Sequence, residues 1–208
     1  KKKVTVTVIG LGYVGLPFAN LILKNKFKCI GIDLSPIIRK IKKKKNTKIS
    51  ITHLYNSISN SDIIIYTLPT PLNKKQNPDL KILKNSISRS FRHYKKGQLI
   101  ILESTSYPGT TRELFKPLEK KFKIGTDIFV GFSSERIDPG NIKFTIDKIP
   151  KVISGYRKNC LQILDTFYKN LFNKVYKASN LEIAEMSKIF ENVFRAVNIS
   201  LVNEIKEL

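Results

Sequence analysis

The sequence predicts an α/β fold, with a doubly wound parallel sheet followed by one long C-terminal helix. Strand and helix patterns alternate regularly along most of the chain, which favours a parallel sheet covered by helices. A glycine-rich segment, residues 10–15 (GLGYVG), separates the first strand pattern from the first helix pattern. Residues 181–208 repeat apolar side chains every three or four positions, as a single long helix does.

The N-terminal elements follow from simple patterns. Residues 4–9 alternate as a strand does, and residues 14–24 follow as a helix. Residues 29–33 form a second short apolar strand, and residues 63–68 are almost entirely apolar, which is typical of a strand buried on both faces. Between these two strands we expect a helix at 36–45, a strand at 48–51 and a short helix at 53–59.

Prolines mark the next boundaries. Pro69 and Pro71 end the strand at 63–68 and open a polar loop, and Pro108 stands at the start of a helix, a position that proline favours. The further elements expected are helices at 79–94, 108–122 and 157–172, and strands at 98–102, 128–132, 151–154 and 174–176. The apolar positions of the last helix are Ile183, Met186, Phe190, Val193, Val197, Leu201 and Ile205. We expect one domain at 1–178 and the start of a connecting, dimerising helical domain at 179–208.

The charge of the chain is strongly positive, with 38 Lys and Arg against 16 Asp and Glu and a formal net charge of +22. Such a charge attracts nucleic acids and anionic membranes. However, the lysines are spread along the whole chain with one dense run at 42–45, arginine is scarce, and no aromatic residues interleave with the run to stack on bases. A general compositional bias therefore explains the charge better than a nucleic-acid interface, and we expect no nucleic-acid partner.

Other classes of protein are disfavoured by composition. Cys29 and Cys160 are too few for a disulfide framework, which suits a reducing cytosol, and no stretch is long enough for a membrane span. We expect a cytoplasmic protein with no membrane partner and no metal site. The chain begins without methionine and its last residues continue a helical pattern, so we expect both ends to be cut from a longer protein.

The glycine-rich segment predicts a Rossmann-type dinucleotide site. Gly10 permits the tight turn, Gly12 allows the backbone to approach a pyrophosphate, and Gly15 lets the helix pack closely on the strand. Asp33 ends the next strand, where its carboxylate accepts ribose hydroxyls and repels a 2′-phosphate, so NAD is favoured over NADP. The alternative to a dinucleotide site is a strand–turn–helix unit that uses glycine only for packing. Arg39 is assigned to the adenosine end, with a plain surface arginine as its alternative.

Four later segments carry a family resemblance. They are residues 68–71 (LPTP), 103–111 (ESTSYPGTT), 134–141 (SERIDPGN) and 185–195 (EMSKIFENVFR). In this order after the glycine-rich turn, they resemble the UDP-glucose/GDP-mannose dehydrogenase family over essentially the whole chain. Within that family the chain looks most like the UDP-N-acetylhexosamine 6-dehydrogenases, because Arg136 stands where UDP-glucose enzymes usually have phenylalanine.

The resemblance implies an activity and a cofactor site. Members oxidise a sugar C6 hydroxyl to a carboxylate in two NAD-dependent steps, through a cysteine thiohemiacetal and a thioester. Tyr13, Val14, Asp33, Thr70 and Thr105 are implied to contact NAD. For Thr70 and Thr105 the alternative is a threonine that only caps the end of a strand.

The resemblance also implies a substrate site for a UDP-sugar. Glu135 assists the hydrolytic step, and Arg136 and Ile137 line the sugar nucleotide. Lys188 stabilises oxyanion charge and Asn192 holds substrate or water. Arg195 meets the sugar or diphosphate, and its spacing from those two residues places all three on one helical face. For Lys188 a solvated surface lysine is the alternative.

The chain departs from the family in two respects. The family's glycine-rich cysteine segment is missing, and neither Cys29 nor Cys160 matches it; the connection between Asp33 and Asp62 also looks short. We therefore expect the NAD-binding part of a UDP-N-acetylhexosamine 6-dehydrogenase of polysaccharide precursor synthesis. It lacks the C-terminal UDP-sugar-binding domain and is inactive alone. A non-catalytic NAD-binding remnant, dimerising through the last helix, is the second interpretation, and a basic nucleic-acid-binding module is the third.

Overall fold

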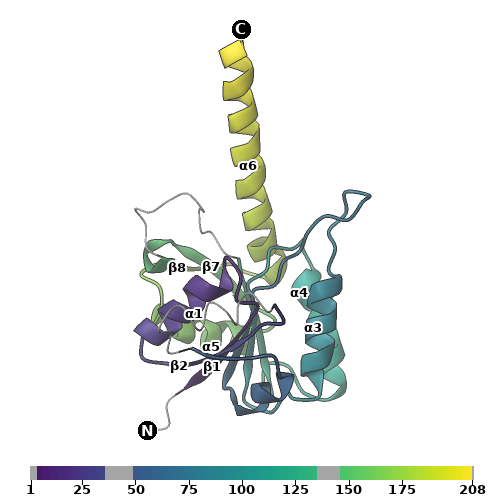
Figure 1. Cartoon of the computed structure of the whole chain (residues 1–208), viewed down its shortest axis with the longest axis vertical. Helices are drawn as coiled ribbons and strands as arrows, with labels where there is room; N and C mark the ends of the chain where they lie inside the picture. The colour runs from purple at the N-terminus through teal and green to yellow at the C-terminus, as the bar shows by residue number, and fades with distance from the viewer. Residues whose placement is uncertain (1–3, 36–48, 135–145, 208) are drawn as a thin grey trace.

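A computed structural model describes residues 4–35, 49–134 and 146–207 (Figure 1). Its eight-stranded sheet has the order β3-β2-β1-β4-β5-β6-β7-β8. The strands are β1 (Thr5–Ile9), β2 (Lys28–Ile32), β3 (Ser50–Thr52), β4 (Ile63–Tyr66), β5 (Leu99–Leu102), β6 (Phe129–Ser133), β7 (Lys151–Gly155) and β8 (Val175–Lys177). The α-helices are α1 (Gly15–Lys24), α3 (Lys81–Phe91), α4 (Thr110–Phe115), α5 (Lys158–Lys169) and α6 (Leu181–Glu207), and the short 3₁₀ helices are η1 (Tyr55–Asn60), η2 (Lys116–Lys120) and η3 (Ile146–Lys148).

The predicted fold class is confirmed, with one correction to the direction of a strand. The first six strands of the sheet are parallel to one another, as expected; in sheet order they are β3, β2, β1, β4, β5 and β6. Strand β7 is antiparallel to β6, with Phe132 opposite Ser154, and is parallel to β8. The sheet is therefore mixed at this end. The direction of a strand is not encoded in its apolar pattern, so the sequence could not indicate this reversal.

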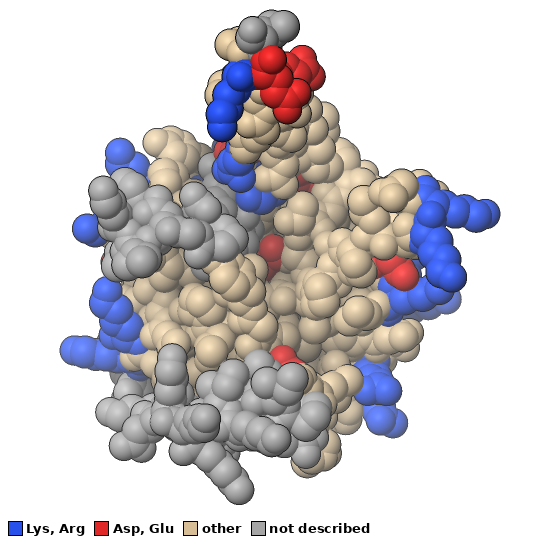
Figure 2. Space-filling view, turned by 45° about the horizontal axis from the view of Figure 1, so that its top comes forward, with Lys and Arg blue, Asp and Glu red and all other residues tan. Residues whose placement is uncertain are grey.

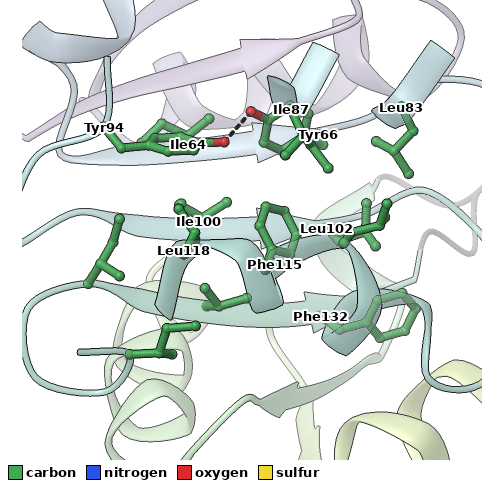
Figure 3. Close-up of a cluster of buried hydrophobic side chains, with 14 of the residues drawn as sticks. Ile64, Tyr66, Leu83, Ile87, Tyr94, Ile100, Leu102, Phe115, Leu118 and Phe132 are labelled. Carbon is green, nitrogen blue, oxygen red and sulfur yellow. Dashed lines mark hydrogen bonds between the residues drawn. The ribbon is translucent and has the colours of Figure 1, made fainter. Parts of the chain in front are cut away.

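Both faces of the sheet are covered, which explains why its central strands are apolar throughout. Helices α3 and α4 pack on one face, where Ile64, Tyr66, Ile100 and Leu102 of β4 and β5 point toward them (Figure 3). Helices α1 and α5 pack on the other face against the alternate residues of the same strands. On the first face the hydroxyls of Tyr66 and Tyr94 lie 2.5 Å apart and form a hydrogen bond inside the core.

Two local predictions need correction. The helix expected at 108–122 is α4 followed by η2, because Pro117 has no N–H to donate and stands at the start of the 3₁₀ turn. The short helix expected at 53–59 is the 3₁₀ helix η1. Cys160 lies on α5, and its side chain is fully buried in the core. The helix expected at 36–45 lies outside the described residues.

Helix α6 leaves the domain after its first turns (Figure 1). Leu181, Ala184, Glu185 and Lys188 are its buried residues. Every position of the predicted apolar stripe is about half exposed or more: Ile183, Met186, Phe190, Val193, Val197, Leu201 and Ile205, together with Phe194, Ile199 and Val202. This helix therefore carries more apolar surface than the domain covers. Across the described ranges, none of the helices combines the length and apolarity that a bilayer crossing requires.

Candidate cofactor-binding site

A cleft of about 680 Å³ opens at the carboxyl edge of the parallel strands, where ligands bind in folds of this class. Figure 2 views this edge: acidic atoms are visible in the hollow, whereas most lysine and arginine side chains lie around its outline. The lining comes from the glycine-rich turn, the ends of β1, β2, β4 and β5, and the exposed side of α3. Its residues are Ile9, Gly10, Gly12, Tyr13, Val14, Ile32, Asp33, Leu34, Tyr55, Thr67, Leu68, Pro69, Thr70, Ile82, Asn85, Ser86, Arg89, Glu103, Ser104 and Thr105.

The glycine-rich turn has the geometry that was expected of it. Gly10 has a φ of +92°, and a Cβ there would lie 3.0 Å from the carbonyl oxygen of Thr67. A Cβ at Gly15 would lie 1.8 Å from the carbonyl oxygen of Gly10, so only glycine permits this packing of α1 on β1. A Cβ at Gly12 would meet no described atom within 4 Å. The backbone at Gly12 therefore faces open space that a phosphate group can occupy.

The N-terminus of α1 lies beside this space, because its N-cap residue Val14 lines the cleft together with Gly12. Among the described residues no side chain caps this terminus, and its first turn contains no acidic residue. Free N–H groups and the positive end of the helix dipole favour an anion here. Together with Gly12, this arrangement fits the pyrophosphate of a dinucleotide.

Asp33 lines the cleft and also holds the turn in place. One of its carboxylate oxygens accepts the N–H of Leu11 at 2.7 Å, and the other accepts the N–H of Ser35 at 2.7 Å. Because a carboxylate offers about four acceptor positions, two remain for ribose hydroxyls. The carboxylate is thus fixed at the end of β2, on the side of β1 where the adenosine half of the cofactor is expected.

Thr70 and Thr105, two further predicted cofactor residues, are brought together. The hydroxyl of Thr70 donates a hydrogen bond of 2.7 Å to the carbonyl oxygen of Thr105, and both residues line the cleft. Thr67 stabilises the glycine-rich turn, because its hydroxyl donates a hydrogen bond of 2.6 Å to the carbonyl oxygen of Gly10. The two threonines form the rim between β4 and β5, opposite the side that Asp33 occupies.

A buried ionic cluster that the sequence analysis missed lies at the end of β5. Glu103 lines the cleft and accepts a hydrogen bond of 2.7 Å from the ammonium group of Lys151. The hydroxyl of Tyr168 donates to the other carboxylate oxygen of Glu103. Lys151 also donates to the carbonyl oxygen of Ser134 at 3.1 Å. An acid that ends an apolar strand was the signal used for Asp33, and it also applied to Glu103.

Helix α3 contributes a second set of residues that the sequence analysis missed. Ile82, Asn85, Ser86 and Arg89 line the cleft with Tyr55 of η1, whose hydroxyl hydrogen-bonds with that of Ser86 at 2.9 Å. Their helical spacing alone would also suit an ordinary solvent-facing side. Among the described residues, Arg89 is the arginine that lines the cleft. Arg39, which the sequence assigns to the adenosine end, lies outside the described residues.

The predicted substrate residues divide into three groups. Glu135, Arg136 and Ile137 lie outside the described residues. Lys188 is buried at the base of α6, so the alternative of a solvated surface lysine is wrong. Asn192 and Arg195 are exposed on the part of α6 that leaves the domain. Within the described residues, these two do not converge with Lys188 on a common pocket.

A carboxylate fixes the base of α6. Glu185 is fully buried and accepts hydrogen bonds from the N–H of Gly109 at 2.5 Å, the N–H of Thr111 at 2.7 Å and the hydroxyl of Thr111 at 2.6 Å. Glu185 thereby serves as the acceptor at the N-terminus of α4. Burial raises the pKa of Glu185, against the lowering effect of these hydrogen bonds. Lys188 lies one helical turn further along, so its place depends on this contact.

Neither cysteine has the properties of a nucleophile. Cys29 lies in β2 and Cys160 in α5, and both are buried. Burial raises the pKa of the Cys29 thiol to about 12 and also raises the pKa of the Cys160 thiol. Thiolate, the reactive form, is therefore scarce at neutral pH for both residues.

Sequence and structure comparisons identify relatives. Residues 34–172 match the UDP-glucose/GDP-mannose dehydrogenase family, NAD binding domain, and residues 182–208 match the central domain of that family. Protein CapL of Staphylococcus aureus is 37% identical over 96% of this chain and 51% of its own length. UDP-N-acetyl-D-glucosamine 6-dehydrogenase of Pseudomonas aeruginosa is 33% identical over 98% of this chain and 52% of its own length.

Two solved structures of related dehydrogenases also match the chain. The UDP-N-acetyl-mannosamine dehydrogenase Cap5O from Staphylococcus aureus superposes with a TM-score of 0.85 and 29% identity, covering 97% of this chain and 53% of that chain. UDP-D-ManNAc dehydrogenase from Pyrococcus horikoshii gives a TM-score of 0.87 and 28% identity, covering 96% and 52%. The chain thus spans about half the length of the curated relatives it matches. The matched domain is an NAD-binding domain, so the predicted cofactor, NAD, is confirmed.

Proposed function

The chain belongs to the UDP-glucose/GDP-mannose dehydrogenase family, and we propose that it forms the NAD-binding half of a UDP-N-acetylhexosamine 6-dehydrogenase. The observation that carries this proposal is the cleft itself. It combines the open backbone at Gly12, the uncapped start of α1 and the fixed carboxylate of Asp33. Similarity to a UDP-N-acetyl-D-glucosamine 6-dehydrogenase and to a UDP-N-acetyl-mannosamine dehydrogenase supports the substrate class.

In this proposal the cleft would hold the NAD that accepts the hydride from C6 of the sugar. Lys188 lies at the base of α6 and stabilises negative charge on the oxygen at C6, as its match to the family motif implies. Glu135, Asn192 and Arg195 keep the roles that the resemblance gives them in hydrolysis and substrate binding, as do Arg136 and Ile137 in lining the sugar nucleotide. The product is a uronic acid, a precursor for polysaccharide synthesis. We place the NAD-binding domain at 1–178 and the connecting helical domain at 179–208.

The thiol of the second oxidation step has to come from outside the two cysteines of this sequence. Cys29 and Cys160 are both buried, and neither lines the cleft. The 208-residue chain by itself is therefore proposed to bind NAD without completing the oxidation. A non-catalytic, NAD-binding fragment remains the second candidate, and the same burial of both thiols favours it.

Helix α6 is proposed as the contact surface of a homodimer. Its exposed apolar residues include Phe190, Phe194 and Val202, each more than 60% exposed. A contiguous apolar surface of this kind usually marks a protein interface. The match of 182–208 to the central domain of the family supports a connecting role for the helix.

Calorimetric titration of the chain with NAD and NADP tests the cofactor assignment. We expect NAD to bind more tightly, because Asp33 repels a 2′-phosphate. Asp33→Ala is expected to weaken NAD binding and to narrow the preference for NAD over NADP. Asp127→Ala serves as the control, because Asp127 precedes β6 at the opposite edge of the sheet and does not line the cleft. Tighter binding of NADP to the unmodified chain would refute the assignment of Asp33.

A further inference from the structure

A second pocket, which we call the basic pocket, lies between η1 and the C-terminal end of α3. It has a volume of about 470 Å³ and is lined by side chains from residues 53–56 and 89–93. Tyr55 and Arg89 also line the cofactor cleft, whereas His53, Arg92 and His93 line the basic pocket but not the cleft. The basic pocket therefore adjoins the cleft and is built largely from residues to which the cofactor site gives no role.

Cationic and imidazole groups dominate the polar lining of the basic pocket. The chain has two histidines, and both of them, His53 and His93, lie here although they come from different segments. Arg89 and Arg92 add two guanidinium groups, in a chain where arginine is scarce beside lysine. Among the described residues that line this pocket there is no Asp or Glu. A lining of this composition suits an anion.

The two arginines are not neutralised by a carboxylate within the described part of the chain. Arg112 pairs with Glu182 at 2.8 Å, but neither Arg89 nor Arg92 forms an ion pair there. The Nε–H of Arg92 donates instead to Nε2 of His93 at 3.3 Å. Burial and the nearby charge of Arg92 both lower the pKa of His93. The pocket is thus positively charged before any ligand enters it.

The dipole of α3 accounts for only part of this arrangement. Basic side chains are favoured at the C-terminus of a helix, and Arg89 and Arg92 stand at that end of α3. That preference does not act on His53, which precedes η1, and it requires no cavity. The N–H groups of a guanidinium match the oxygens of a phosphate, and sites for small molecules have volumes of about 300–1,000 Å³. The size and the donors of the basic pocket therefore fit a phosphorylated small molecule.

We propose that the basic pocket is a second ligand site of this domain, which binds the phosphate groups of a diphosphate through its two arginines and two histidines. It differs from the pyrophosphate position of the cofactor, because Gly12 lines the cleft and not the basic pocket. A free diphosphate and a nucleoside diphosphate share this chemistry. Leu54 and Tyr55 line the same pocket and give a nucleotide base an apolar side to lie against.

Imidazole NMR signals of the full chain test this proposal, because both histidines of the chain lie in the basic pocket. With saturating NAD in the cleft and constant ionic strength, titration with inorganic pyrophosphate is expected to shift both signals until they reach a plateau. Arg92→Ala is expected to weaken pyrophosphate binding by about tenfold, the scale of one lost hydrogen bond between charged groups. Lys95→Ala, which removes a nearby charge outside the lining, is the control and is expected to change the affinity by less than about twofold. NAD affinity is expected to stay the same in both variants.

The same titration with ADP distinguishes the two sources of the diphosphate. Tighter binding of ADP than of pyrophosphate identifies a nucleotide as the ligand, and equal or weaker binding identifies the free diphosphate. Imidazole signals that do not move with either probe would overturn the inference. A loss of affinity in Lys95→Ala as large as that in Arg92→Ala would also overturn it, because the anion would then respond to the general positive charge of the chain.

Discussion

Replacing Glu185 by alanine tests how α6 is attached to the domain. The substitution removes three hydrogen bonds, from the N–H groups of Gly109 and Thr111 and from the Thr111 hydroxyl. At about 1 kcal/mol net for each bond, the loss is about 3 kcal/mol, and two backbone N–H groups left without an acceptor raise it to about 3–5 kcal/mol. The free energy of unfolding in urea, with unchanged m-value, measures this loss.

A matched control lies one turn away on the same helix. Glu182 pairs with Arg112 at 2.8 Å, but both side chains are more than a third exposed, so Glu182→Ala is expected to cost less than about 1 kcal/mol. Hydrogen exchange at the amides of Gly109 and Thr111 gives a local measure and is expected to accelerate only in Glu185→Ala. Equal effects of the two substitutions would show that the buried carboxylate does not fix α6.

The pH dependence provides a second check on Glu185. Burial raises its folded-state pKa above the ordinary value of 4.5, so the folded protein binds this proton more tightly than the unfolded protein does. The contribution of Glu185 to stability is therefore expected to rise as the pH falls through the folded pKa toward 4.5. Glu185→Gln cannot titrate, so its stability deficit relative to the unmodified chain is expected to grow over that window. A deficit that shrinks on acidification would contradict the assigned direction.

Three further predictions concern the turn, the helix and the thiols. Gly15→Ala is expected to lower the free energy of unfolding by more than about 2 kcal/mol, whereas Gly12→Ala keeps that stability but weakens NAD binding in calorimetry. Phe190→Glu combined with Phe194→Lys is expected to abolish self-association of the chain in sedimentation, and a well-behaved monomer before substitution would contradict the proposed dimer surface. The isolated chain is expected to show no steady NADH production with UDP-N-acetylglucosamine or UDP-N-acetylmannosamine, and turnover abolished by Cys160→Ser would refute the view that the thiol lies elsewhere.

The parts of the site that could be predicted are those whose local geometry restricts the residue type. Gly10 and Gly15 are fixed by a positive φ and by a carbonyl that a Cβ would overlap, so their spacing predicts the turn. Asp33 follows a strand next to that turn, and the rule for strand ends predicts its place in the cleft. The same rule applied to Glu103 would have found the buried acid at the end of β5.

Other features depend on contacts between distant segments, which no local pattern records. The antiparallel direction of β7 is one, because its apolar residues fit either direction. Lys151 is another: nothing in a chain with so many lysines distinguishes a buried lysine from an exposed one. The end of α4 differs from these two, since Pro117 was visible in the sequence and indicates a break in any helix that contains it.

The composition of the chain explains why its acids, rather than its lysines, mark the site. The chain has 38 Lys and Arg against 16 Asp and Glu, so carboxylates are its rarer charged groups. Asp33, Glu103 and Glu185 are each held by at least two hydrogen bonds from named donors, and all three lie at or beside the carboxyl edge of the sheet. In Figure 2 most lysine and arginine side chains lie at the outline of the same face. Because desolvation of a carboxylate is costly, the fully buried acids Glu103 and Glu185 need compensating partners. Through its partners Glu185 joins the base of α6 to the start of α4, and the half-buried Asp33 joins the end of β2 to the glycine-rich turn.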